Sequence, residues 1–260
     1  MPPGGLACTD EGARTPLVFI HGFPLARGAW AAQVAAFRGT HRVIAPDLRG
    51  FGESAPPTGP VTMDSCADDI LALLESRTTG PVVLAGHSMG GYIALAFARR
   101  YPAMLRGLVL AGTRSGPDTP EGAAGRRATA ETVRAQGIGV VVDAMAPKML
   151  AADNNDADLT ARVRGLMMSA SPAGVVAALL GMAERPDATP GLAAVAVPTL
   201  VITSAEDLLI PAPESEKMAA AIPGATLKIL PRGGHLFALE RAEDFNRALR
   251  DWLAVSVRTG

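Results

Sequence analysis

A serine flanked by glycines is the first candidate for chemistry in this 260-residue chain. Ser88 lies between Gly86 and Gly90, after an apolar run at 81–85 that is typical of a buried strand and before a segment at 92–100 that is typical of a buried helix. A serine on such a turn has a strained backbone, which small residues two before and two after it tolerate. Its hydroxyl points out at the carboxyl edge of a sheet, beside the free N–H groups of the next helix. This G-x-S-x-G pattern predicts that Ser88 is a nucleophile.

A nucleophilic serine needs a base, and the chain has four histidines. We expect His87 to pack and hydrogen-bond beneath the serine turn, His21 to brace the loop after the first clear strand, and His41 to lie in a solvated polar turn. His235 remains, on a glycine-rich loop after a strand-like segment. A histidine there can reach into a crevice at the carboxyl end of the sheet, so His235 is the predicted base.

The acid that orients the base is expected on the loop after another strand. Asp207 follows such a segment, and its carboxylate would accept the Nδ1–H of His235 and leave Nε2 facing Ser88. The same carboxylate would stabilise the imidazolium that forms during attack. Glu206 is the adjacent alternative and is expected to face solvent, while Asp118 is a weaker alternative after an earlier strand.

Several motifs together resemble an α/β-hydrolase over essentially the whole chain. They are His21-Gly22-Phe23-Pro24, the 47–54 segment Asp-Leu-Arg-Gly-Phe-Gly-Glu-Ser, the serine turn, the Asp207 loop and Gly234-His235. The set is most similar to small esterases and lactonases of the 3-oxoadipate enol-lactonase type and to cofactor-free haloperoxidase or perhydrolase-type esterases. The chain order Ser88, Asp207, His235 is the order that this fold uses.

The resemblance implies an oxyanion hole and excludes some relatives. The hole would consist of the backbone N–H groups of Phe23 and Met89, which do not depend on side-chain identity. A serine at position 88 argues against haloalkane dehalogenases and epoxide hydrolases, whose nucleophile at this place is an aspartate. In the 47–54 loop, Asp47 and Arg49 are expected to bond neighbouring loops, with no catalytic role.

Alternating strand and helix signals predict an α/β fold with a mostly parallel sheet covered by helices on both faces. The expected strands are 17–21, 42–46, 81–86, 107–112, 198–203 and 225–230, and the expected helices are 28–37, 64–77, 89–100, 213–221 and 240–255. The hairpin that usually opens the family is expected to be shortened or irregular here, because few residues precede the first clear strand.

A helix-rich stretch interrupts this alternation and predicts an inserted helical cap at 115–195, between core segments 1–114 and 196–260. Its expected helices are 121–136, 140–151, 156–169 and 173–184. Four methionines of the cap, Met145, Met149, Met167 and Met168, are candidates for an adaptable apolar ceiling over the substrate. The alternative is that these helices only pack on the core.

Composition limits the classes of function. The chain is 48% hydrophobic, enough for one large core, and its net charge of −1 gives no reason to expect a nucleic-acid partner. No apolar stretch is long enough to span a bilayer and the N-terminus lacks a secretory signal, so we expect a cytoplasmic protein with no membrane partner. Cys8 and Cys66 are expected to be free thiols, and no metal or cofactor is expected. The oligomeric state is left open.

The predicted chemistry is two-step acyl transfer from a small carboxylic ester or lactone. The same triad could instead cleave a thioester, an amide or a carbon–carbon bond in a vinylogous diketone, or form a peracid when peroxide replaces water. A ligand receptor that keeps the fold and turns over slowly is an alternative from another class of function.

Overall fold

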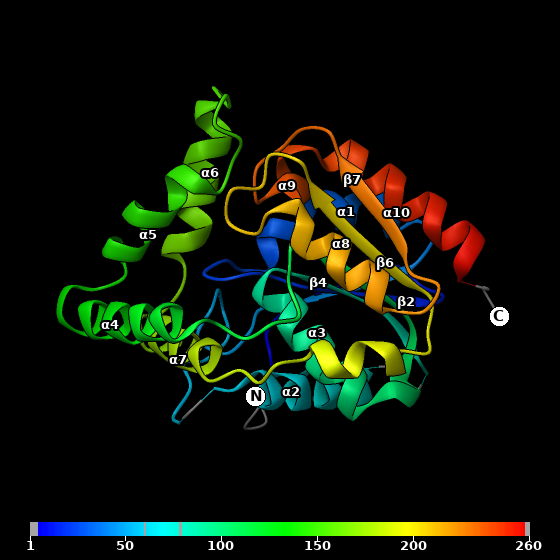
Figure 1. Cartoon of the computed structure of the whole chain (residues 1–260), viewed down its shortest axis with the longest axis horizontal. Helices are drawn as coiled ribbons and strands as arrows, with labels where there is room; N and C mark the ends of the chain where they lie inside the picture. The colour runs from blue at the N-terminus through cyan, green and yellow to red at the C-terminus, as the bar shows by residue number, and fades with distance from the viewer. Residues whose placement is uncertain (1–4, 60, 78–79, 258–260) are drawn as a thin grey trace.

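A computed structural model of the chain describes residues 5–59, 61–77 and 80–257 (Figure 1). Its centre is a seven-stranded sheet in the order β1-β3-β2-β4-β5-β6-β7. The strands are β1 (Cys8–Glu11), β2 (Pro16–Ile20), β3 (Arg42–Pro46), β4 (Val82–His87), β5 (Leu105–Ala111), β6 (Thr199–Ser204) and β7 (Thr226–Leu230). Every neighbouring pair is parallel except β1 with β3. The predicted mostly parallel sheet is confirmed, and the short antiparallel β1 forms the edge that was expected to be shortened.

Helices cover both faces of the sheet because successive side chains of a strand point to opposite faces. In β2, Leu17 and Phe19 face a core cluster with η1 (Arg27–Trp30), α1 (Ala31–Phe37), α9 (Phe237–Glu240) and α10 (Ala242–Ser256). Val18 and Ile20 face the other cluster, with α2 (Met63–Arg77), α3 (Met89–Arg100) and α8 (Ala212–Ala221). The 3-10 turn η2 (Pro102–Met104) leads from α3 into β5.

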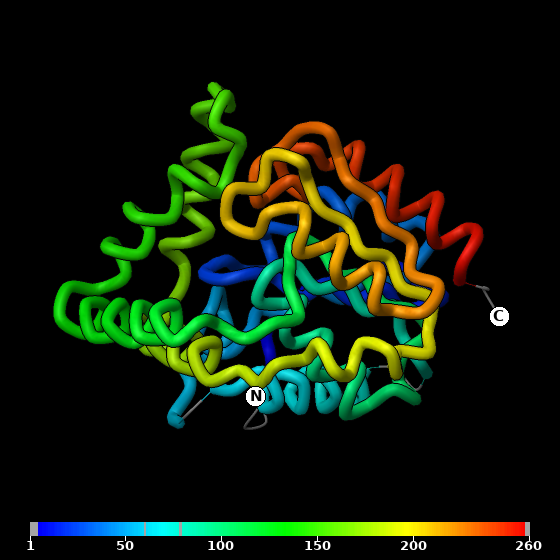
Figure 2. The backbone as a smooth tube through the Cα atoms, viewed as in Figure 1, coloured from blue at the N-terminus to red at the C-terminus, as the bar shows by residue number. Residues whose placement is uncertain are grey.

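Between β5 and β6 the chain forms helices and adds no strand to the sheet. They are α4 (Pro120–Gln136), α5 (Gly139–Met145), η3 (Ala146–Lys148), α6 (Ala157–Met168), α7 (Pro172–Ala183) and η4 (Thr189–Ala194). In Figure 2 the green tube of α4 to α7 stands beside the core as a separate layer. Side chains cap the starts of three of them: Thr119 for α4, Asp156 for α6 and Ser171 for α7.

One predicted cap helix is shorter than expected. The sequence predicts a helix over 140–151, but α5 ends at Met145 and a 3-10 turn containing Pro147 follows. Proline has no N–H to donate and its ring clashes with the preceding turn of a helix, so the break lies where Pro147 requires it.

Within the described residues no single helix is long and apolar enough to cross a bilayer. Only α6 and α7 taken together pass that test of length and composition, and they are bent by 87°.

Candidate active site

The turn between β4 and α3 holds Ser88 in a conformation that non-glycine residues rarely adopt. Its φ is 54° and its ψ is −115°. A Cβ added to Gly86 would collide with the carbonyl oxygen of Gly90, and a Cβ added to Gly90 would collide with the carbonyl oxygen of Ile20. The two flanking glycines are therefore required for the backbone to pack this closely. Strained residues of this kind concentrate at functional sites.

His235 and Asp207 are joined by a hydrogen bond in a buried position. His235 Nδ1 lies 2.8 Å from Asp207 Oδ2, and the two residues are 2% and 3% exposed. The other carboxylate oxygen, Oδ1, accepts the backbone N–H groups of Leu209 and Ile210, each at 2.9 Å. An ionised carboxylate only accepts, so Nδ1 carries the proton and Nε2 is the acceptor nitrogen of the ring.

These contacts also decide the charge of Asp207. Burial alone would raise the pKa of its carboxyl, but the hydrogen bonds from His235 and from the N–H groups of Ile210 and Leu209 outweigh burial and hold the pKa below its usual value. Asp207 is therefore ionised at neutral pH and can keep the Nδ1–H tautomer of His235 in place.

His87 connects the serine turn to the loop that carries His235. Its Nε2–H donates to the carbonyl oxygen of His235 at 2.9 Å, and the two ring centroids are 4.7 Å apart. Burial lowers the pKa of His87 to about 3, so the ring is neutral at physiological pH. As predicted, His87 packs and hydrogen-bonds beneath the turn. A Cβ on Gly112, after β5, would lie 3.3 Å from His87 Nε2 and 3.4 Å from Asp207 Oδ2, so the ends of β4, β5 and β6 meet here.

The predicted oxyanion loop runs beside Ser88. A Cβ on Gly22 would lie 3.2 Å from the Cβ of Ser88. His21 braces this loop, as expected: its Nε2 accepts the N–H of Leu48 at 3.0 Å, and its Nδ1–H donates to the carbonyl oxygen of Gly22 at 2.9 Å. Phe23 directly follows Gly22 and Met89 directly follows Ser88. The oxyanion-hole role of these two N–H groups remains a prediction.

The two alternative acids have other partners. Glu206 accepts the backbone N–H of Gly233 at 3.0 Å. Asp118 is paired with three arginines, Arg114, Arg126 and Arg185. In the described parts of the chain, Asp207 is the acid that bonds the His235 ring.

The four candidate methionines lie in different environments. Met145 lines a pocket of about 390 Å³, together with Phe23 and with residues of α4, α5 and α7. Met149 and Met167 are 0% exposed and pack in a cluster between the cap and the core, whereas Met168 is 52% exposed. Met145 is therefore the best placed of the four, and substrate contact by any of them remains a prediction. Other residues of this pocket, including Thr129 and Leu179, are not predictable from the sequence, because helical periodicity does not show which buried face borders a cavity.

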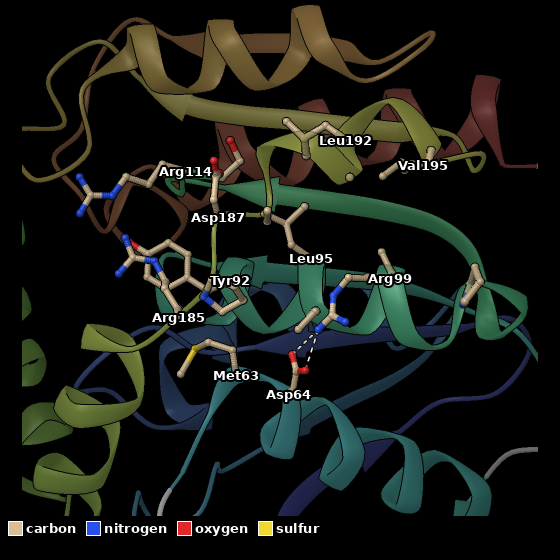
Figure 3. Close-up of a pocket in the computed structure, with 18 residues that line it drawn as sticks. Met63, Asp64, Tyr92, Leu95, Arg99, Arg114, Arg185, Asp187, Leu192 and Val195 are labelled. Atoms are coloured by element: carbon tan, nitrogen blue, oxygen red, sulfur yellow. Dashed lines mark hydrogen bonds and ion pairs between the residues drawn. The ribbon is translucent and has the colours of Figure 1, made fainter. Parts of the chain in front are cut away.

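A second pocket, of about 540 Å³, lies between α3 and the segment that ends in η4 (Figure 3). Leu95 and Leu192 are among its apolar lining residues. On one side the guanidinium carbon of Arg185 lies 4.3 Å from the ring centroid of Tyr92. Ser88, Asp207 and His235 line neither this pocket nor the one beside Phe23, but the pocket beside Phe23 includes the residue whose N–H is the predicted oxyanion donor.

The 47–54 loop has structural contacts. Asp47 accepts the backbone N–H groups of Arg27 at 2.7 Å and Glu53 at 3.0 Å, and Arg49 pairs with Asp69 of α2. The structural role agrees with the prediction, but Arg49 bonds a helix and Asp47 bonds its own loop as well as Arg27, where bonds to neighbouring loops were expected. Among the residues described, no group of three or more His, Cys, Asp or Glu side chains is placed to hold a metal ion.

Comparison with known proteins assigns the chain to a family. The pattern of the alpha/beta hydrolase family matches residues 17–248. A thermophilic esterase from Thermogutta terrifontis is 43% identical, with a TM-score of 0.94 over 97% of this chain and 94% of the other. A 2-hydroxymuconate semialdehyde hydrolase from Pseudomonas putida is 30% identical, covering 94% of this chain and 89% of its own length. A 3-oxoadipate enol-lactonase from Acinetobacter baylyi is 26% identical, and the match covers 94% of this chain and 90% of the lactonase. The expected resemblance is confirmed: the chain belongs to the alpha/beta hydrolase family.

Proposed function

We propose that this hydrolase cleaves a carboxylic ester or lactone through Ser88, His235 and Asp207. The observation that carries the proposal is the buried hydrogen bond of 2.8 Å between Asp207 and His235 Nδ1, which leaves Nε2 to accept a proton. Ser88 supplies the nucleophile from a strained turn that His87 ties to the His235 loop. The similarity to the thermophilic esterase at 43% identity supports an ester as the substrate.

The reaction would proceed in two steps. His235 Nε2 takes the proton of Ser88 Oγ as the oxygen attacks the carbonyl carbon, and the N–H groups of Phe23 and Met89 hold the resulting oxyanion. The alcohol then leaves with the proton from His235. Water, deprotonated by the same nitrogen, attacks the acyl-serine; His235 then returns the proton to Ser88 Oγ as the acid is released. Asp207 stays ionised and stabilises the imidazolium in both steps.

The pocket beside Phe23 is the proposed place for the part of the substrate that lies away from Ser88, because Phe23, the predicted oxyanion donor, lines it. It is bordered by apolar residues such as Val141 and Leu179, and by the polar side chains of Arg126 and Thr129. Such a mixed lining suits a small substrate with an apolar body.

The test is hydrolysis of p-nitrophenyl esters from acetyl to octanoyl, and of a simple lactone, by the wild type and by Ser88→Ala. We expect Ser88→Ala to lose at least about 10³-fold in kcat, with its thermal unfolding unchanged. Ser76→Ala, on α2, is the matched control, because among the described residues Ser76 Oγ bonds the carbonyl of Leu73 in its own helix and nothing else. Turnover by Ser88→Ala at the wild-type rate would overturn the proposal.

A further inference from the structure

A single carboxylate connects the cap to the loop that carries His235. Glu240, the last residue of α9, accepts the backbone N–H of Gly234 at 2.7 Å. The same carboxylate accepts the backbone N–H of Ala151 at 3.1 Å and the side-chain amide of Asn154 at 2.5 Å. Ala151 and Asn154 lie in the stretch between η3 and α6, so Glu240 bonds segments more than 80 residues apart.

A second contact joins the same two segments on the other side of His235. The N–H of Leu236 donates to the carbonyl oxygen of Met149 at 2.8 Å. Gly234 lies so close to the cap that a Cβ there would collide with the backbone of Leu150. Both sequence neighbours of His235 are therefore tied to the stretch between η3 and α6: Gly234 through Glu240, and Leu236 directly.

The bonds to Glu240 help to hold the His235 loop against the cap. Hydrogen bonds to an ionised carboxylate are about twice as strong as those between neutral groups. Removing the carboxylate would leave the N–H groups of Gly234, which is buried, and Ala151, which is half-buried, without this acceptor, and an unsatisfied buried donor is destabilising. On the cap side the loop would then keep only the bond from Leu236 to Met149, so it could shift relative to Ser88, which lies on a different element.

We propose that Glu240 is a positioning residue, which sets the place of His235 by holding its loop against the cap. The inference rests on the proposed function, since it assumes that His235 is the base for Ser88. On this proposal the cap helps to place His235, in addition to any role that it has in binding substrate. A shift of about 1 Å in a reacting group can cost about 10²-fold in rate, so contacts outside the reacting atoms can control kcat.

The experiment compares Glu240→Ala and Glu240→Gln with the wild type, with p-nitrophenyl acetate as substrate. We expect Glu240→Ala to lower kcat by about tenfold or more and to leave KM within about twofold, because the base moves while the binding pocket stays. Glu240→Gln should recover part of the loss, since its amide oxygen accepts one N–H while its amide nitrogen accepts none. Glu206→Ala is the matched control, because Glu206 accepts the N–H of Gly233 in the same loop but, within the described residues, does not bond the cap.

A purely structural role predicts a different pattern. Glu240→Ala would then lower the melting temperature and leave kcat at the wild-type value, which would overturn the inference. An equal loss of kcat in Glu206→Ala would also overturn it, since bonding to the cap would then not be the cause. If Glu240→Ala does not fold, Glu240→Gln decides: a fall in kcat of about threefold or more at unchanged KM supports the inference, and wild-type kcat overturns it. Activity in Ser88→Ala would instead refute the proposed function.

Discussion

Replacing Asp207 by asparagine tests how the acid sets the tautomer of His235. In the wild type Oδ1 accepts two backbone N–H groups and Oδ2 accepts the Nδ1–H of the ring. An asparagine has one oxygen and one NH₂ group. If its oxygen stays on the two backbone donors, its NH₂ group faces Nδ1, which must then accept. The ring proton moves to Nε2, and His235 can no longer take the proton of Ser88.

The size of the expected loss in kcat follows from the two bonds that the backbone N–H groups of Leu209 and Ile210 donate to residue 207. Flipping the amide would restore the working tautomer, but the NH₂ group would then face the N–H groups of Leu209 and Ile210. Each lost bond costs about 1–3 kcal/mol, so the flip costs about 2–6 kcal/mol in all. At about 1.4 kcal/mol for each factor of ten, the working orientation is depleted by about 30-fold to 10⁴-fold. We expect kcat of Asp207→Asn to fall within that range.

The assay is steady-state hydrolysis of the best p-nitrophenyl ester, with circular dichroism to confirm that the variant is folded. Glu206→Gln is the control: it changes the adjacent acid, keeps an oxygen that can accept the N–H of Gly233, and should keep kcat within about twofold of wild type. A loss below about tenfold in Asp207→Asn would refute the tautomer argument. A large loss of kcat in Glu206→Gln, with none in Asp207→Asn, would identify Glu206 and not Asp207 as the acid that orients His235.

Three further predictions concern stability, each checked by urea unfolding. The pKa of His87 is about 3 in the folded protein and about 6.5 in the unfolded chain, so the unfolded chain binds an extra proton between these values. As the pH drops from 7 to 5, the free energy of unfolding should therefore fall by about 2 kcal/mol more in wild type than in His87→Gln. An equal pH dependence of the two proteins would contradict this. Met149→Ala should lower the free energy of unfolding by about 2–5 kcal/mol because the side chain is fully buried, whereas Met168→Ala should change it by less than about 0.5 kcal/mol. Equal losses in the two variants would contradict the burial of Met149 and the exposure of Met168. Gly90→Ala should lower the free energy of unfolding by about 3 kcal/mol or more, because its Cβ would collide with the backbone of β2. Wild-type stability of this variant would contradict the close approach of Gly90 to Ile20.

The sheet and the candidate site were predictable because their signals are local. Strands β2, β4 and β5 are apolar runs buried on both faces, as strands in the middle of a parallel sheet must be. His235 and Asp207 each follow a strand, and parallel strands bring their carboxyl ends to one edge. The sequence alone therefore indicates that the two residues meet.

Other features depend on contacts that the sequence does not show. The residues of β1, Cys-Thr-Asp-Glu, have no apolar alternation, and the strand is defined by its antiparallel register with β3. Helical periodicity marks Met149 and Met168 alike as cap residues, yet one is buried and the other exposed. Glu240 reads as an ordinary helix residue until the cap segment is placed beside it. The break after α5 is different, since Pro147 was visible in the sequence.

The central claim, that Ser88 is the nucleophile, is tested most directly by covalent labelling. The wild type would be treated with a p-nitrophenyl alkylphosphonate, digested and mapped by mass spectrometry, with Ser88→Ala treated alongside. We expect one phosphonyl group per chain, located on Ser88, together with loss of ester hydrolysis, and no labelling of Ser88→Ala. Labelling at another residue, or full hydrolysis after Ser88 has been modified, would contradict it.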